Sequence, residues 1–118
     1  MARHNFRNLK IWIDGINLSE ATYSITKTFP KSERFNLISQ LNRCAVSVPS
    51  NIAEGSAKST DKHFKTYLET SLGSAFEWET QFLIAYRLKF VSEELYKDKL
   101  DDIQKLQRMI GAFIDRLS

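Results

Sequence analysis

Apolar side chains recur every three or four residues along most of the chain, a spacing that places them on one face of an α-helix. Four such segments are separated by short breaks, and they predict helices at about residues 6–27, 31–54, 60–89 and 92–117. Connections this short force neighbouring helices to run antiparallel. We therefore predict one all-α domain over residues 1–118, an elongated, antiparallel up-down-up-down four-helix bundle.

Prolines and glycines mark the breaks in the first half of the chain. Pro30 ends the first segment, because the residue before a proline avoids the helical region. Pro49 lies inside the second segment and removes a hydrogen bond to the carbonyl of Ala45. The apolar phase continues through Ile52, so we predict a kink at Pro49 rather than a helix end. Gly55 is the predicted C-terminal cap of this helix.

The later segments begin with residue types that cap helices. Ser59 or Thr60 precedes the third segment, and Ser92 precedes the fourth, where Glu93 and Glu94 complement the helix dipole. These signals support helix starts near residues 60 and 92.

The first segment carries more apolar residues than one buried face needs. One stripe consists of Ile11, Leu18 and Ile25, at a strict spacing of seven residues. A second set near one face consists of Leu9, Trp12, Ile13, Ile16 and Tyr23. A stripe left exposed by the bundle would form a surface for a partner.

Polar residues follow the second and third segments in lines beside the apolar stripes. The line of the second segment consists of Gln40, Arg43, Ser47, Asn51 and Glu54, and that of the third consists of Thr70, Ser74, Glu77 and Gln81. The candidates for a polar network are Gln40, Arg43, Ser47, Asn51, Glu54, Ser74 and Glu77. Two interpretations stay open: solvated helix faces, or a polar network between helices or subunits that fixes their register. Such a network would be specific, because an unpaired buried polar group costs about 1–3 kcal/mol. In the network interpretation, Arg43 pairs with Glu77 or another acid.

Composition and charge narrow the class of protein without deciding its function. The chain has 118 residues, of which 42% are hydrophobic and 26% charged, which is typical of globular domains and excludes global disorder. Its net charge of +3 permits a polyanionic partner such as RNA or DNA but does not require one. Residues 1–48 hold seven basic and three acidic side chains, so the excess lies there.

The cations of this basic region are candidates for phosphate contacts in a nucleic-acid complex. The candidates are Arg3, Arg7, Lys10, Lys31 and Arg34, and the first three share one face if the first helix extends that far. The alternative is that all of them are ordinary solvated charges.

The sequence offers no assembled catalytic or metal site. A di-iron bundle needs Glu-x-x-His pairs, and neither His4 nor His63 has a glutamate three residues before it. The HEPN ribonuclease pattern fails too, because no arginine stands about five residues before His63. Cys44, the single cysteine, falls in an apolar stripe and is expected in the core. We therefore expect no enzyme activity, no metal and no cofactor. With no membrane-spanning or targeting segment evident, we expect a cytoplasmic protein.

Several motifs together resemble a known family. They are Phe6-x-x-Leu9-x-Ile11-Trp12, Ser47-Val48-Pro49-x-Asn51-Ile52-Ala53-Glu54-Gly55 and Gly73-Ser74-x-x-Glu77. This set resembles the four-helix-bundle family first noted as reading frames inside intervening sequences of bacterial 23S ribosomal RNA genes. The chain is also similar to the accessory variability determinant of diversity-generating retroelements.

The resemblance implies a homo-oligomer, a pentameric barrel with a central channel. The accessory determinant binds nucleic acid and a reverse transcriptase through a basic surface. The resemblance thus favours a non-enzymatic nucleic-acid-binding or ribonucleoprotein accessory protein. The alternative is an adaptor barrel that docks a partner protein, such as a polymerase, without touching nucleic acid. A small hydrolase or nuclease is disfavoured, because no nucleophile has a positioned base.

Overall fold

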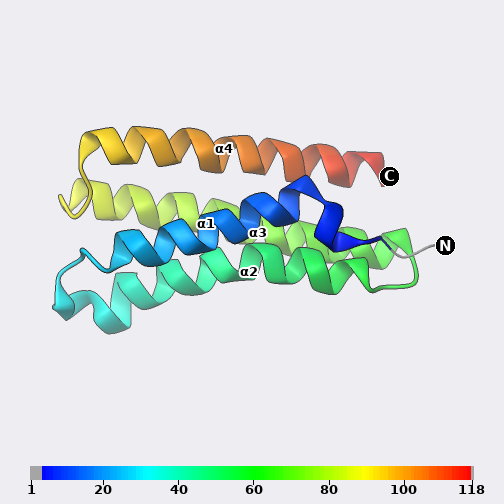
Figure 1. The fold of residues 1–118 in the computed structure, drawn as a ribbon, viewed down its shortest axis with the longest axis horizontal. Coiled ribbons are helices and arrows are strands. Elements are labelled where there is room, and N and C mark those ends of the chain that lie inside the picture. The colour runs from blue at the N-terminus through cyan, green and yellow to red at the C-terminus, as the bar shows by residue number, and fades with distance from the viewer. Residues whose placement is uncertain (1–3, 118) are drawn as a thin grey trace.

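The computed structural model describes residues 4–117, and this span is all-α, with four long helices and no strand (Figure 1). The helices are α1 (Lys10–Thr26), α2 (Ser39–Ser56), α3 (Asp61–Arg87) and α4 (Glu93–Arg116). They run along the long axis of a molecule that measures 47 × 24 × 19 Å. α2 packs extensively on α3, α1 lies on α2 and α4 lies on α3, whereas α1 and α4 share a narrow contact. The predicted all-α class with four helices is confirmed.

The two ends of the molecule differ in what they contain. The α1–α2 and α3–α4 connections lie together at one end, which we call the connection end (residues 27–38 and 88–92). The α2–α3 loop and the two chain ends lie at the opposite end (Figure 1). The ring of Phe29 is buried and packs on Phe90, with 5.5 Å between ring centroids, which ties the two connections to each other.

One of the two apolar stripes of α1 enters the core. Ile11, Leu18 and Ile25 are buried, together with large side chains of the other three helices such as Leu41, Phe64, Trp78 and Ile110. The second set is divided: Leu9 and Trp12 pack against the core, whereas Ile13 is 41% and Tyr23 is 49% exposed. The bundle therefore buries one stripe of α1 and leaves an exposed stripe that includes Ile13 and Tyr23.

Two helices begin later than their hydrophobic patterns predict. α1 begins at Lys10 rather than at residue 6, because Leu9 has an extended backbone (ψ 125°). The preceding turn, η1 (Phe6–Asn8), is capped by Asn5, whose Oδ1 accepts a hydrogen bond from the Arg7 amide at 3.2 Å. α2 begins at Ser39 rather than at residue 31.

Two short turns, η2 (Lys31–Glu33) and η3 (Arg34–Ile38), precede α2. Asn36, inside η3, has a non-helical backbone (φ −117°, ψ −107°), so the chain breaks there before it enters the regular helix. The apolar stripe of this segment begins at Leu37, after the break, so it gave no support for a helix start at residue 31.

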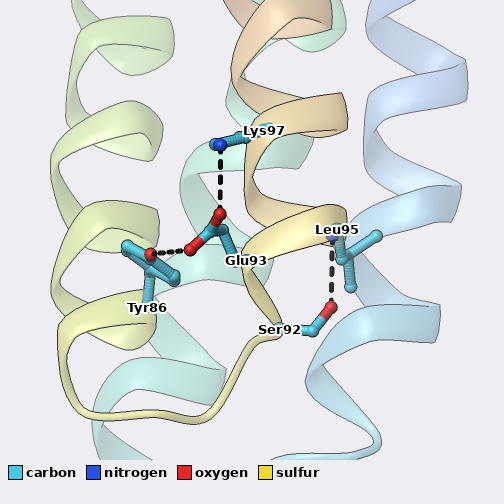
Figure 2. A network of polar contacts seen from close by, with 5 residues as sticks. All are labelled: Tyr86, Ser92, Glu93, Leu95 and Lys97. Carbon is cyan, nitrogen blue, oxygen red and sulfur yellow. Dashed lines mark hydrogen bonds and ion pairs between the residues drawn. The ribbon is translucent and has the colours of Figure 1, made fainter.

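The predicted N-caps of α3 and α4 are confirmed. Thr60 Oγ1 accepts from the His63 amide at 3.2 Å, and Ser92 Oγ accepts from the Leu95 amide at 3.1 Å (Figure 2). Glu93, which follows Ser92, binds Lys97 Nζ at 3.0 Å. The hydrogen bond from Lys97, assisted by its charge, lowers the pKa of the exposed Glu93 carboxyl.

Gly55 does not cap α2, contrary to the prediction. The helix runs through Ser56, and no described glycine has a positive φ angle. A Cβ added to Gly55 would lie 2.6 Å from Tyr67 Cβ and 2.9 Å from Phe64 Cδ1. Gly55 is therefore required because α3 passes too close for any side chain at this position.

α2 continues through Pro49, and two residues of α1 accommodate the proline. Because Pro49 has no N–H, the Ala45 carbonyl lacks its usual helical donor. Ser19 Oγ of α1 lies 3.1 Å from that carbonyl oxygen and 3.0 Å from the Gly15 carbonyl oxygen of its own helix, so its one proton is shared between the two acceptors. Gly15 makes room for the proline ring, since a Cβ there would lie 3.1 Å from Pro49 Cβ. Pro49 thus forms part of the α1–α2 contact.

Two residues after the end of α3, Lys89 has a backbone conformation that favours glycine. Lys89 has φ 68°, and the amides of Lys89 and Phe90 donate back to the carbonyls of Tyr86 and Ala85, each at 2.9 Å. This pattern is a Schellman motif, in which glycine normally occupies the left-handed position. The Cβ of Lys89 is therefore a cost to stability.

Replacing Lys89 with glycine should raise the free energy of unfolding by about 0.5–1 kcal/mol, because glycine adopts positive φ without steric conflict. Chemical denaturation followed by circular dichroism would measure the change. Lys89→Ala is the matched control, since it removes the charge but keeps the Cβ. Equal stability of the two variants would contradict the explanation.

Candidate nucleic-acid interface

The structure divides the predicted phosphate-binding cations into two groups. Arg3 lies outside the described residues. Arg7 and Lys10 lie before and at the start of α1, whereas Lys31 and Arg34 follow its end. The 17 residues of α1 separate the groups by about 25 Å at 1.5 Å per residue. Arg7 and Lys10 also do not share one helix, because α1 begins at Lys10.

The cations near the start of α1 are already engaged. Lys10 Nζ forms an ion pair with Asp14 Oδ1 at 2.8 Å. The Arg7 guanidinium lies over the Phe6 ring, 4.4 Å from its centroid. At this end of α1 Lys10 is therefore compensated by an acid, whereas Arg7 keeps its charge but lies against a neutral ring, apart from the cations after α1.

The cations after α1 surround an open hollow of about 460 Å³ at the connection end, which we call the basic hollow. Its lining residues are Tyr23, Thr26, Lys27, Phe29, Lys31, Arg34, Ile38 and Asn42. Lys27, Lys31 and Arg34 are exposed, and no acidic residue is among the described residues that line it. The nearest acid in sequence, Glu33, accepts from the Leu37 amide at 3.4 Å and belongs to the local turn.

Lys27 is a member of this site that the sequence analysis missed. Its signal was present, since three cations fall within the eight residues from Lys27 to Arg34. What the sequence did not show is that the chain reverses here, so that Tyr23 of α1 and Asn42 of α2 line the same hollow.

Aromatic side chains stand beside these cations. Tyr23 is 49% exposed, and Phe35, next to Arg34 in the chain, is 82% exposed. The Arg34 guanidinium lies 5.4 Å from the centroid of the Phe35 ring. Cations and exposed aromatic rings on one short surface can contact both phosphates and base faces.

The polar lines of α2 and α3 form two clusters of hydrogen bonds between the helices. Ser47 Oγ lies 2.9 Å from Ser74 Oγ, and Asn51 Nδ2 donates to Ser47 Oγ at 2.9 Å. In the second cluster, Gln81 Nε2 donates to Gln40 Oε1 at 3.3 Å and to Glu77 Oε2 at 3.1 Å. Gln81 belongs to the predicted polar line of the third segment and follows Glu77 by one helical turn.

The predicted Arg43–Glu77 pair does not form. Both side chains are exposed, and none of the ion pairs among residues 4–117 joins them. Glu77 instead accepts from Gln81 on its own helix. Glu54 is also exposed, so it and Arg43 lie on the outer face of α2 rather than within the clusters.

Cys44 is a core residue with an unreactive thiol. It is 4% exposed, and burial, assisted by the charge of Glu77, raises its pKa from 9.0 to about 12. The protonated thiol donates to Gln81 Oε1 at 3.6 Å. At neutral pH the thiolate needed for nucleophilic attack is therefore almost absent.

Residues 4–117 contain neither a cluster of metal ligands nor a helix that could cross a membrane. In this span no three histidine, cysteine, aspartate or glutamate side chains gather closely enough to hold a metal ion. His4 packs on the Phe64 ring at 4.9 Å, and its Nε2 lies 3.8 Å from Asp61 Oδ1. None of the described helices has the length and apolar content needed to cross a membrane.

Comparison with known proteins identifies the family. The family model described as 23S rRNA-intervening sequence protein matches residues 7–112. A crystal structure of a protein of unknown function from the S23 ribosomal protein family of Bacteroides thetaiotaomicron VPI-5482 has the same fold. It superposes with a TM-score of 0.82 at 18% identity, over 88% of this chain and 97% of that one. No curated protein matches this sequence. On the extent of the family match, the chain belongs to the 23S rRNA-intervening sequence protein family.

Proposed function

We propose that this protein is a non-enzymatic, oligomeric nucleic-acid-binding protein that acts as an accessory to a ribonucleoprotein. The observation that carries the proposal is the basic hollow, where Lys27, Lys31 and Arg34 are exposed without an acidic residue among the described lining residues. Such cations bind phosphates with strong salt dependence and little sequence preference.

Self-assembly is part of the proposal, as a pentameric barrel. The exposed stripe of α1, with Ile13 at 41% exposure, supports a contact with a second copy of the chain. A pentamer would multiply the net charge of +3 per chain by five and create a strong field for a polyanion. Assembly would thereby turn a mildly basic subunit into a cationic particle.

Replacing Ile13 with glutamate should separate the oligomer into 13.7 kDa subunits and weaken RNA binding by about 100-fold, since the subunits would no longer act together. Sedimentation velocity and fluorescence anisotropy with labelled RNA would measure the two effects. Ile84→Glu is the matched control, because Ile84 is 45% exposed on α3 and away from the α1 stripe. The control should keep both the oligomer and the affinity.

The unmodified protein tests the proposal in the same experiment. Binding should weaken by at least tenfold when the salt is raised from about 50 to 200 mM. A monomer at micromolar concentration would refute the assembly, and the absence of RNA or DNA affinity at low salt would refute nucleic-acid binding.

A second candidate function is an adaptor that docks another protein, such as a polymerase, without direct nucleic-acid contact. The exposed apolar stripe of α1 supports it, since the same surface could accept a different protein. Recovery of one partner protein after nuclease treatment, together with a lack of affinity for purified RNA and DNA, would favour the adaptor.

A further inference from the structure

We propose that the basic hollow takes single-stranded nucleic acid, with bases stacked on Tyr23 and Phe35 and phosphates held by Lys27, Lys31 and Arg34. The inference rests on the proposed function and specifies where and in what form the nucleic acid binds. Its basis is the combination of exposed rings, cations and a hollow at one end of the molecule.

Phe35 has no role in the core of the subunit. Its ring is 82% exposed, and η3 contributes no buried residue. Burying a phenylalanine side chain is favourable by about 1.5–3 kcal/mol, and the subunit by itself gains almost none of this. The Arg34 guanidinium over the ring, 5.4 Å from its centroid, extends the flat surface that a base could cover.

Tyr23 supplies a second ring and itself lines the hollow, whereas Phe35 lies beside the hollow, next to the lining residue Arg34. Tyr23 comes from α1 and Phe35 from η3, so the chain reversal brings both to the connection end. Between α1 and α2, Thr26 Oγ1 donates to Asn42 Oδ1 at 3.0 Å and links the residues that line the hollow. A volume of about 460 Å³ falls within the range of pockets that hold small ligands, roughly 300–1,000 Å³.

The positive charge of the basic hollow indicates which kind of molecule binds there. A second copy of this chain that met this surface through its own basic hollow would set cations against cations. A polyanion instead satisfies Lys27, Lys31 and Arg34, which have no acidic counterpart among the described residues of the lining. The charge complementarity therefore favours nucleic acid over self-contact at this position.

The exposed rings of Tyr23 and Phe35 favour single-stranded nucleic acid over a duplex. Bases of a duplex are stacked on one another, so their faces are not available to a protein ring, whereas unpaired bases can stack on Phe and Tyr. The segment that presents Phe35 consists of the short turns η2 and η3, and these do not provide the long helix that enters a DNA major groove.

The test uses the full-length protein and labelled RNA of about ten nucleotides, either as a single strand or as a duplex of the same sequence. Tyr23→Leu and Phe35→Leu remove the aromatic face but keep an apolar side chain, so self-association should persist. Each should weaken single-strand binding by about 5- to 100-fold in fluorescence anisotropy. Phe35→Tyr, which keeps an aromatic ring, should bind the single strand as tightly as the unmodified protein. Phe76→Leu is the matched control, because Phe76 is also an exposed phenylalanine (52%) but lies on α3.

The outcomes separate this inference from the proposed function. Preference for the single strand, with loss in the two leucine variants alone, supports stacking in the hollow. Equal binding of duplex and single strand, unchanged in these variants, overturns stacking and leaves nucleic-acid binding intact. Loss of the oligomer in either variant assigns the surface to self-contact and also overturns it. If neither RNA nor DNA binds at low salt, both the proposed function and this inference fail.

Discussion

Gly55→Ala should lower the free energy of unfolding by about 1–3 kcal/mol or more, although it adds a single methyl group to a helix. In an unconstrained helix the same change would be stabilising, since alanine is the better helix former by about 1 kcal/mol. The reversal comes from packing, because the new Cβ would lie 2.6 Å from Tyr67 Cβ and 2.9 Å from Phe64 Cδ1. Tyr67 Cβ is bonded to the backbone of α3, so the helix itself must move.

Gly73→Ala is the control that isolates this packing effect. Gly73 also lies within a long helix, but a Cβ added there meets nothing within 4 Å in the described structure. This variant should be more stable than the unmodified protein by about 0.5–1 kcal/mol. Denaturant unfolding of the two variants would measure the expected decrease in the free energy of unfolding for Gly55→Ala and the expected increase for Gly73→Ala. Equal shifts in the same direction would show that α3 does not approach Gly55 as closely as the structure has it.

Gly55 also shows which features of the fold the sequence alone does not predict. The apolar periodicity predicted four helices, and the side chains of Thr60 and Ser92 located two of their starts within a residue. Such signals are local, because a cap or a stripe depends on neighbours in the chain. A glycine near a helix end fits a cap equally well, and its contact with α3 depends on two helices that the sequence does not place.

The same limit governs the polar residues. The lines on α2 and α3 indicated that these helices share hydrogen bonds, and Ser47 and Ser74 do meet. The partner of Glu77, however, depended on the length and orientation of the neighbouring side chains. Gln81, and not Arg43, donates the hydrogen bond to the Glu77 carboxylate. Opposite charges on facing helices are therefore a weaker guide to pairing than short polar side chains at a close contact.

For the candidate site, the sequence supplied the cations but not the surface. Lys31 and Arg34 were identifiable from charge, and Tyr23 from the second stripe of α1. The chain reversal and the break before α2 set Lys31 and Arg34 against Tyr23 of α1, so that all three line one hollow. That break rests on Asn36, whose conformation has no marker in the apolar pattern.

Trp78→Ala should be the most damaging single substitution considered, with a loss of about 3–5 kcal/mol in the free energy of unfolding. Trp78 is 1% exposed and stacks on Phe82, with 4.5 Å between ring centroids. Removing the indole leaves a cavity in the middle of the bundle. Trp12→Ala is the matched control and should cost clearly less, because Trp12 is half-buried at the edge of the core.

Thr22→Val examines the polar part of the same contact. The indole Nε1–H of Trp78 donates to Thr22 Oγ1 at 3.0 Å, and valine keeps the shape of threonine while leaving that donor buried and unpaired. The expected cost is about 1–3 kcal/mol. Combined with Trp78→Phe, which removes the donor, Thr22→Val should cost less than in the unmodified background. Strictly additive losses in this double-mutant cycle would show that the hydrogen bond contributes nothing.

The Thr22–Trp78 contact also connects stability to the candidate site. Thr22 precedes Tyr23 in α1, so the hydrogen bond to Trp78 fixes the rotation of the helix that presents Tyr23 at the basic hollow. Thr22→Val should therefore weaken single-stranded RNA binding by a few-fold under conditions where the protein remains folded. Ser19→Ala, which loses a bond from α1 to Ala45 but lies farther from Tyr23, should affect binding less. Equal binding by all three proteins would mean that α1 is held in place without this contact.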